Sequence, residues 1–505
     1  MPLVRLLLVL ACFLVAPATE GLPASFDAAI PLHIYAELPD GSVRLVGQTP
    51  VIDGAAISLG TCRMWWVAPI APLDDLGVME LCRALATTDA PGLSLANQDI
   101  SDFGLSELRL LRRLQYLDLS GCDELTNAAC ALIRLAPGLR ELHLNEVPID
   151  DKGLALLAHL PQLKRLSLSD TKVSNEVGTV LARFPELRRL DLSETAITNA
   201  GLSVLKPGRL SHLMLDDCKV DDSGLATLAS FTALQELSLR DCPISDAGLA
   251  LLSDLKTLHR LDLSETKVSD AGLGHLATLR GLRELGLART SVSVDGLTAL
   301  SALPELSTLD LSRCSKVDDA AAACIPSLRP LRTLNLHATK ITDAGLGALG
   351  GSAVRSLDCS STKVTDGGMP ALGALKGLHH LSLADTRLGD PGLAHLQNLQ
   401  NLEELDIHGT KVGDAGTALL RGIGKLRVVD VSDTSIGDVG ILHARELLAL
   451  EWLALKDTKV SDLGLAHLHK LPRLRTIYLD DSKATSAGDR ALRQALAGAA
   501  VVLDD

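Results

Sequence analysis

Histidine and aspartate side chains recur toward the C-terminal end of the chain at a spacing that could bind a metal ion or support hydrolysis. Asp406 and His408 are two residues apart, which places both on the same face of an extended strand, and His380 occurs about one repeat earlier. An imidazole beside a carboxylate can ligate a divalent cation or act as a general base. The spacing enforces no ligand geometry, so we predict no metal, no other cofactor and no catalytic residue.

The sequence contains none of the usual catalytic signatures: HExxH, GxSxG and the Walker loop are all absent. Gly345, Gly347 and Gly350 match GxGxxG, but they fall in a segment expected to be helical and lack the strand that a dinucleotide site needs immediately before it. These absences favour a binding protein over an enzyme. A metal-dependent hydrolase that uses His and Asp side chains remains an alternative.

The elements that position these residues are copies of a 24-residue unit. Residues 258–281 read LHRLDLSETKVSDAGLGHLATLRG, and the next copy begins at Leu282. Leu261 and Leu263 alternate with polar residues, as in a short strand with one buried face. A turn through Thr266 follows, and Ser269 then begins a short helix. One unit is therefore a strand, a turn and a short helix.

The second leucine of each Leu-x-Leu pair, or the apolar residue in its place, recurs eighteen times from position 95 to position 503, with spacings of 23 to 25 residues. The sequence therefore predicts eighteen strands. A single unit cannot bury its own leucines, so neighbouring units must stack to form a continuous core. A chain built in this way grows in one dimension, and its length of 505 residues does not imply several compact domains.

This pattern resembles the leucine-rich repeat family from about residue 62 or 93 to residue 505. The resemblance implies an α/β solenoid, or horseshoe, with a concave parallel β-sheet and convex short helices. Where many family members carry asparagine after the strand, this chain mostly has threonine, whose hydroxyl can bond to the turn backbone. The Val/Ile-Ser/Thr-Asp-x-Gly-Leu segment is similar to that of the cysteine-containing subclass found in F-box proteins and in bacterial secreted proteins. An intracellular F-box-like substrate-recognition subunit of a ubiquitin ligase is therefore a second alternative function.

The N-terminal region differs from the repeats. Residues 1–18 carry an arginine, an apolar run too short to span a bilayer, and a small-x-small cleavage signal, which predicts a secretory signal peptide. Alternatively, Cys12 is lipidated in a bacterial lipobox. Residues 22–92 are predicted to form an N-terminal cap with a β-hairpin and a degenerate first coil, in which Trp65 and Trp66 cover the end of the core. We expect a bacterial protein that is secreted or held in the cell envelope (periplasmic or extracellular), with no transmembrane span and with a polar C-terminal cap at the end of the 93–505 solenoid.

Ten cysteines without a CxxC pair argue against a zinc ribbon or finger. Cys62 and Cys82 precede the regular array and are the predicted disulfide, because an exported protein permits one. We expect the cysteines at repeat positions to act as small apolar side chains at inward turn sites: Cys122, Cys218, Cys242 and Cys314.

A net charge of −14 argues against a nucleic-acid partner, which normally needs a concentrated basic surface. Aspartate recurs at the middle outward position of the strands, so we expect a neutral or basic protein or peptide as partner. Bulkier groups join these positions in the C-terminal half, including aromatic residues, which make up only 2% of the chain. The predicted partner-binding residues are His337, Asp358, His380, Asp406, His408, Asp430, Trp452, Lys456 and Tyr478. The sequence thus predicts a non-enzymatic binding scaffold that acts outside the cytoplasm through its concave face.

Overall fold

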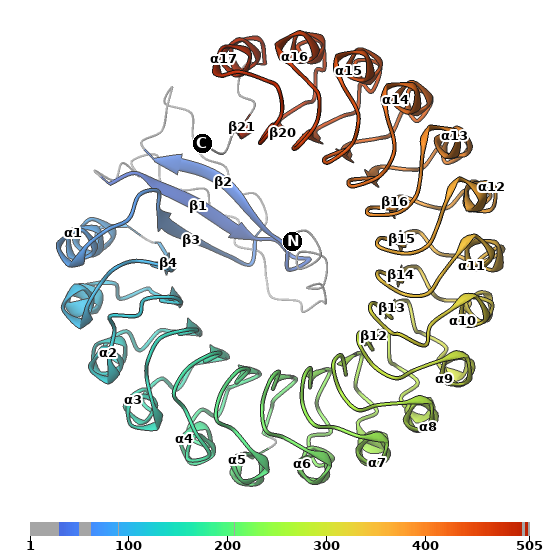
Figure 1. Ribbon diagram of the computed structural model, residues 1–505. Helices are drawn as coiled ribbons and strands as arrows, with labels where there is room; N and C mark the ends of the chain where they lie inside the picture. The colour runs from blue at the N-terminus through green and yellow to red at the C-terminus, as the bar shows by residue number, and fades with distance from the viewer. Residues whose placement is uncertain (1–29, 50–61, 89, 207, 497–499, 503–505) are drawn as a thin grey trace. The chain divides into compact units, whose positions relative to one another are not determined.

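The computed structural model of the 505-residue chain describes residues 30–49, 62–88, 90–206, 208–496 and 500–502. The predicted signal peptide and Cys12 lie outside the described residues. The chain divides into two compact units, Met1–Cys242 and Pro243–Asp505. Both are stacks of short parallel strands alternating with short helices, with the strands on one side of the stack and the helices on the other (Figure 1).

The first unit begins with an antiparallel hairpin. Strand β1 pairs with β2, with a bulge between Ile34 and Tyr35, and its other edge pairs with β3. Val67 of β3 pairs in parallel with Leu93 of β4, where the regular coils begin. The hairpin expected in this region is therefore present, while the predicted boundaries of a cap domain remain a prediction. The strands of this unit are β1 Leu32–Glu37, β2 Val43–Thr49, β3 Met64–Pro69, β4 Gly92–Ser94, β5 Tyr116–Asp118, β6 Glu141–His143, β7 Arg165–Ser167, β8 Arg189–Asp191, β9 His212–Met214 and β10 Glu236–Ser238.

The helices of the first unit lie between successive strands. They are α1 Asp75–Leu85, the 3-10 helix η3 Asp102–Leu110, α2 Asn127–Ile133, α3 Asp151–Leu156, α4 Val177–Leu181, α5 Asn199–Val204 and α6 Asp222–Leu228. Asp74 accepts a hydrogen bond from the Gly77 amide and caps α1.

The second unit continues the same order of elements, and β11 to β21 pair in parallel one after another. Its strands are β11 Arg260–Asp262, β12 Glu284–Gly286, β13 Thr308–Asp310, β14 Thr333–Asn335, β15 Ser356–Asp358, β16 His380–Ser382, β17 Glu404–Asp406, β18 Val428–Asp430, β19 Trp452–Ala454, β20 Thr476–Tyr478 and β21 Ala500–Val502. The eighteen strands that the repeat predicts correspond to β4 through β21.

The helical segments of the second unit are short. The α-helices are α7 Asp246–Leu249, α8 Asp270–Leu273, α9 Val294–Ala299, α10 Asp319–Ala322, α11 Asp343–Ala348, α12 Met369–Leu372, α13 Asp390–Leu393, α14 Asp414–Leu420, α15 Asp438–Ala444, α16 Asp462–Leu468 and α17 Ser486–Ala495. The 3-10 helices are η4 Ala250–Asp254, η5 Gly274–Thr278, η6 Leu300–Ala302, η7 Ile325–Ser327, η8 Asp366–Gly368 and η9 Ala394–Asn398. Gly345 and Gly347 lie within α11, which confirms that GLGALG belongs to a repeat helix.

The leucines of each coil form the core. In the coil that begins at Leu258, the residues Leu258, Leu261, Leu263, Leu273 and Leu276 are all completely buried. Each packs beside its counterpart in the next coil, so one coil is stable only in contact with its neighbours.

The turn threonines are buried, and each bonds within its own coil. The hydroxyl of Thr266 donates to the carbonyl of Leu263 at 2.6 Å, and nine other coils repeat this bond at the same distance. The prediction that threonine bonds to the turn backbone is confirmed. These bonds close each turn but do not connect one coil to the next.

The repeat cysteines lie inside the core as expected. Cys122, Cys218, Cys242 and Cys314 are buried, and each thiol donates to a backbone carbonyl of the preceding coil at 3.0 to 3.2 Å. Cys62 and Cys82 are also buried, but both carry free thiols, so the disulfide predicted between them is not present in the structure.

Aspartates at the helix starts connect neighbouring coils. The carboxylate of Asp246 accepts the backbone amide of Ser269 in the next coil at 2.7 Å and its hydroxyl at 2.6 Å. The same amide contact is made in the first unit by Asp75, Asp102 and Asp151, and in the second by Asp270, Asp319, Asp343, Asp366, Asp390, Asp414, Asp438 and Asp462. The sequence suggested only helix capping for this Ser-Asp pair, so its role between coils was missed.

The repeat glycine leaves room for this aspartate. A Cβ atom on Gly272 would lie 2.5 Å from the Asp246 Oδ1 and 2.9 Å from the Leu249 Cδ1. A side chain there would push the carboxylate off the amide that it accepts. The glycine of each Asp-x-Gly segment is therefore needed for the contact with the aspartate of the preceding coil.

Replacing Gly272 by alanine is expected to destabilise the protein by about 1 to 3 kcal/mol, because the added methyl group overpacks the contact with Asp246. Gly274→Ala is the matched control, since a Cβ at Gly274 would meet nothing within 4 Å. In a helical segment that control should be neutral or stabilising by up to about 1 kcal/mol. Urea denaturation of both variants measures the difference, and equal unfolding midpoints would contradict the steric argument.

Candidate binding face

The outward residues of the strands form three columns on the sheet. The first column holds the first residue of each three-residue strand, the middle column holds the third residue, and the third column holds the residue two positions later. In β17 these are Glu404, Asp406 and His408. The strand register aligns each column from coil to coil, so positions that are 24 residues apart in sequence become neighbours.

The middle column is rich in aspartate, as predicted, but neutral residues separate most of its carboxylates. From β11 to β20 it reads Asp262, Gly286, Asp310, Asn335, Asp358, Ser382, Asp406, Asp430, Ala454 and Tyr478. Only Asp406 and Asp430 face each other on adjacent strands in this series. The acidic character of the face is therefore strongest at β17 and β18.

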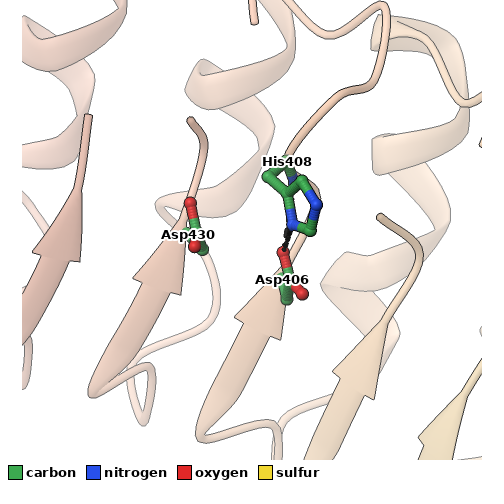
Figure 2. Close-up of side chains that lie close together, drawn as sticks. All are labelled: Asp406, His408 and Asp430. Carbon is green, nitrogen blue, oxygen red and sulfur yellow. Dashed lines mark hydrogen bonds and ion pairs between the residues drawn. The ribbon is translucent and has the colours of Figure 1, made fainter. Parts of the chain in front are cut away.

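Asp406, His408 and Asp430 form a cluster on these two strands (Figure 2). Each residue offers one potential ligand atom, and these atoms all lie within 4.8 Å of one another. The Nδ1 atom of His408 lies 2.9 Å from the Asp406 carboxylate, and its Nε2 atom lies 3.5 Å from Asp385. The sequence placed Asp406 and His408 together but did not identify Asp430 as the third member or Asp385 as the neighbour of the ring.

The charges in this cluster influence one another. The hydrogen bond with Asp406, strengthened by the charges of Asp406, Asp430 and Asp385, raises the pKa of His408 to about 9. Burial, with a contribution from the charge of Asp406, raises the pKa of Asp430. The pKa shift of His408 therefore follows from the negative charge gathered around it, whereas burial is the larger cause of the Asp430 shift.

The other predicted histidines have different partners. The Nδ1 atom of His380 lies 2.8 Å from the Glu404 carboxylate on the next strand, and this hydrogen bond raises the pKa of His380. His337 bonds through Nδ1 to the Ser360 hydroxyl at 2.8 Å. The structure therefore does not bring His380 into the cluster with Asp406 and His408, although the sequence had suggested that combination as a metal site.

The two predicted aromatic residues form a pair. The rings of Trp452 and Tyr478 have centroids 5.3 Å apart at an interplanar angle of 49°. In the middle column only Ala454 stands between Asp430 and Tyr478, so the aromatic pair lies close to the acidic cluster. Lys456 is exposed in the third column, and Asp358 accepts the backbone amide of Ser360. The nine predicted residues thus share one face of β14 to β20 and its following turns, but His337 and Asp358 lie apart from the cluster.

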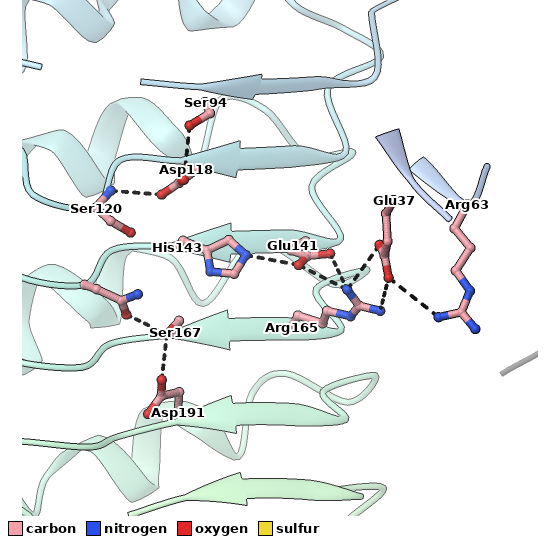
Figure 3. A network of polar contacts seen from close by, with 11 residues as sticks. Glu37, Arg63, Ser94, Asp118, Ser120, Glu141, His143, Arg165, Ser167 and Asp191 are labelled. Atoms are coloured by element: carbon pink, nitrogen blue, oxygen red, sulfur yellow. Dashed lines mark hydrogen bonds and ion pairs between the residues drawn. The ribbon is translucent and has the colours of Figure 1, made fainter. Parts of the chain in front are cut away.

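The first unit has a polar network of its own (Figure 3). Arg165 of β7 lies 3.0 Å from Glu141 of β6 and 3.5 Å from Glu37 of β1, and His143 lies 3.0 Å from Glu141. Glu37 also pairs with Arg63 at 3.6 Å. The end of β1 is therefore tied to the outward face of coils more than 100 residues later in the sequence.

An aromatic row continues from this network. The ring of Trp66 stacks on Tyr35 and on Tyr116, with centroids 5.9 and 4.8 Å apart, and Tyr116 contacts His143. Gly92 stands between Trp66 and Tyr116 in the first column, and a Cβ there would lie 2.6 Å from the Trp66 Cβ. The expectation that Trp66 covers the end of the leucine core is wrong, because its ring belongs to the outward face. Instead, Leu32, Ile34 and Ala36 of β1 are completely buried there.

Two family models match the chain. One, described as a leucine-rich repeat region, covers residues 242–493, and another, described as a leucine-rich repeat, covers residues 186–206. Among curated proteins, none matches significantly. Across the part of the chain that the structure describes, no helix is long and apolar enough to cross a bilayer.

Solved structures that resemble the chain have low sequence identity to it. A leucine-rich repeat protein of Leptospira interrogans is 19% identical, with 86% of this chain and 100% of that chain covered and a TM-score of 0.44. An internalin of Listeria monocytogenes is 19% identical, with coverages of 75% and 94% and a TM-score of 0.38. The leucine-rich repeat ectodomain of an Arabidopsis thaliana membrane receptor kinase, solved in complex with Casparian strip integrity factor 2, is 17% identical, with coverages of 84% and 56% and a TM-score of 0.35.

His143 should make the stability of the first unit depend on pH. Burial alone would lower the pKa of His143, but its hydrogen bond with Glu141 and the charge of Glu141 outweigh burial and raise the pKa above 6.5. A histidine with a raised folded-state pKa stabilises the protein fully below its ordinary pKa, and this contribution is lost as the pH rises through the raised value. Wild-type stability should therefore fall relative to His143→Gln between about pH 6 and about pH 9.

Urea midpoints at the two pH values measure this change. His159→Gln, at an exposed histidine of the same unit, is the control and should follow the wild type at both values. Parallel behaviour of wild type and His143→Gln would show that the ion pair with Glu141 does not contribute.

Proposed function

The chain belongs to the leucine-rich repeat family, and from that premise we propose that it is a non-enzymatic scaffold that binds a protein or peptide through the outward face of its strands. Scaffolds of this family are binding proteins in general, since stacked repeats present an extended surface of side chains. In this chain the proposed contact region is the outward face of β14 to β20 in the second unit.

The observation that carries the proposal is the paired rings of Trp452 and Tyr478 beside the acidic cluster. Both residues are only partly buried, although aromatic residues are scarce in this chain. Large aromatic side chains contribute most of the binding energy in many interfaces because they bury much apolar area with few rotatable bonds. A leucine core has no need of a Trp and a Tyr on its outward side.

The charge of the face favours a neutral or basic partner. Asp358, Asp406 and Asp430 lie in one column of the second unit, and Asp310 continues it. Burial raises the pKa of Asp310, and the charges of Asp262 and Asp358 raise it further, as expected for carboxylates that share a column. A lysine- or arginine-containing segment would complement this column.

We further propose that the protein acts outside the cytoplasm, in the periplasm or extracellular space of a bacterial-type cell. The support is the sequence of residues 1–18, with its arginine, apolar run and small-x-small cleavage signal. Lipidation at Cys12 is the alternative form of the same export proposal.

The F-box-like alternative has less support. It requires a helical F-box before the repeats, whereas Leu32–Glu37 and Val43–Thr49 form a β-hairpin. The hydrolase alternative requires a base that touches a substrate, and the His408 ring is instead held between two carboxylates. A binding scaffold accounts for both the aromatic pair and the acidic column.

The test uses peptides selected from a random displayed library on the wild-type protein. The selected peptides should be rich in lysine and arginine, and Trp452→Ala with Tyr478→Ala should weaken their binding by at least about tenfold, because an aromatic anchor commonly contributes 2 kcal/mol or more. Isothermal titration with the synthesised peptides gives the dissociation constants.

Phe103→Ala is the matched control. Phe103 is an aromatic residue of η3 that is 59% exposed and lies outside the proposed region, so its removal should leave the affinity unchanged. Unchanged binding by the double variant, or selection of mainly acidic peptides, would overturn the proposal.

A further inference from the structure

The cluster of Asp406, His408 and Asp430 brings together two like charges that the rest of its column keeps apart. Adjacent strands are about 4.8 Å apart, and carboxylates directly opposite each other destabilise a sheet unless a positive charge lies between them. Elsewhere from β11 to β20, a neutral residue follows every aspartate of the middle column. The two aspartates on β17 and β18 depart from this pattern and therefore need a positive charge beside them.

The charged ring of His408 pairs with Asp406, so a divalent ion bound here would take the place of the ring proton. Among the residues that the structure describes, the only side chain within ion-pair distance of Asp406 is His408, and neither Lys nor Arg pairs with Asp430. The Asp406 carboxylate accepts a hydrogen bond from the backbone amide of His408 at 3.1 Å, and the Asp430 carboxylate accepts one from the backbone amide of Ser432 at 2.9 Å. The two oxygen donors and the imidazole are thus fixed by the strands, and they converge within 4.8 Å.

The carboxylate of Asp385 lies near the other ring nitrogen of His408. Asp385 lies 3.5 Å from the Nε2 atom of His408, whereas Asp406 lies 2.9 Å from the Nδ1 atom. Figure 2 shows the His408 ring just beyond the end of the strand that carries Asp406. Metal-binding histidines commonly donate their other ring N–H to a carboxylate, which fixes the tautomer and the orientation of the ring. Asp385 is positioned for that role if Nδ1 faces the ion.

The donor set identifies the class of ion. Two carboxylate oxygens and one imidazole nitrogen suit borderline divalent metals such as zinc or manganese, whereas magnesium and calcium prefer oxygen ligands alone. Ligands around one zinc ion are 2.0 to 2.2 Å from it. The three side chains would therefore have to move closer by roughly an ångström, which side-chain rotation can supply.

We propose that Asp406, His408 and Asp430 bind one divalent transition-metal ion on the outward face of β17 and β18, with Asp385 orienting the histidine. Three protein ligands leave at least one coordination position open, so the ion can be shared with water or with a group of a bound partner. This site goes beyond the proposed scaffold function and does not depend on it.

The experiment titrates the full chain, stripped with a chelator, with zinc chloride, manganese chloride, magnesium chloride and calcium chloride in separate calorimetric runs without any peptide. Wild type should bind zinc or manganese at one site that His408→Ala and Asp430→Asn each weaken by at least about tenfold, since each variant removes one ligand. Magnesium and calcium should bind more weakly than zinc.

His380→Ala is the matched control because His380 is a partly exposed histidine on the neighbouring strand that pairs with Glu404 instead. It should leave the affinity unchanged, and circular dichroism should show that every variant is folded. Asp385→Asn should weaken binding less than loss of a ligand does. The site is refuted if zinc and manganese do not bind, if His408→Ala and Asp430→Asn bind as the wild type does, or if His380→Ala is equally impaired.

Discussion

The contact between coils through a carboxylate is the constraint on which the rest of the structure depends. Asp246 bonds to both the amide and the hydroxyl of Ser269 in the next coil, and Gly272 leaves the space that this carboxylate needs. Leucine packing alone specifies burial but not register, because one leucine fits a ladder of leucines about as well as another. The directional bonds accepted by these side chains, which are Asn127, Asn175 and Asn199 in three coils of the first unit and Asp in the others named above, set how each coil is aligned with its neighbour.

A fixed register turns spacing in the sequence into proximity in space. Arg260 and Glu284 occupy the same column on adjacent strands and pair at 2.7 Å, and His380 pairs with Glu404 in the same way. The buried positions are nearly identical from coil to coil, so they carry the fold and cannot distinguish one coil from another. The residues of the outward columns are free to vary. The chemistry of the face is therefore determined by the outward residues that differ from one coil to the next.

The repeating parts of the fold could be predicted because each is local. The strands, the turn bond of Thr266 and the aspartate column follow from one 24-residue unit, and the inward cysteines follow from comparing equal positions in several units. Contacts between residues that do not recur with the repeat were not predicted. The pairing of Glu37 with Arg165 joins a hairpin strand to a coil 128 residues away, and no repeated pattern indicates which coil it reaches. The disulfide between Cys62 and Cys82 was predicted from the expected compartment alone, and the compartment carries no information on the backbone geometry that a disulfide requires.

The sequence predicted the face that carries the candidate site but not which side chains meet there, and the reason is again the register. His380 and Asp406 belong to different columns, so their closeness in sequence did not make them neighbours, whereas Asp406 and Asp430 share a column and face each other. Neighbours on a solenoid are found by comparing equal positions in successive coils. By that comparison, two aspartates in adjacent coils are a local conflict of charge that the fold does not need, and conflicts of this kind are expected where function outweighs stability. In the middle column only Ala454 separates Tyr478 from Asp430, so the ring pair that Tyr478 forms with Trp452 places a second such departure beside the first.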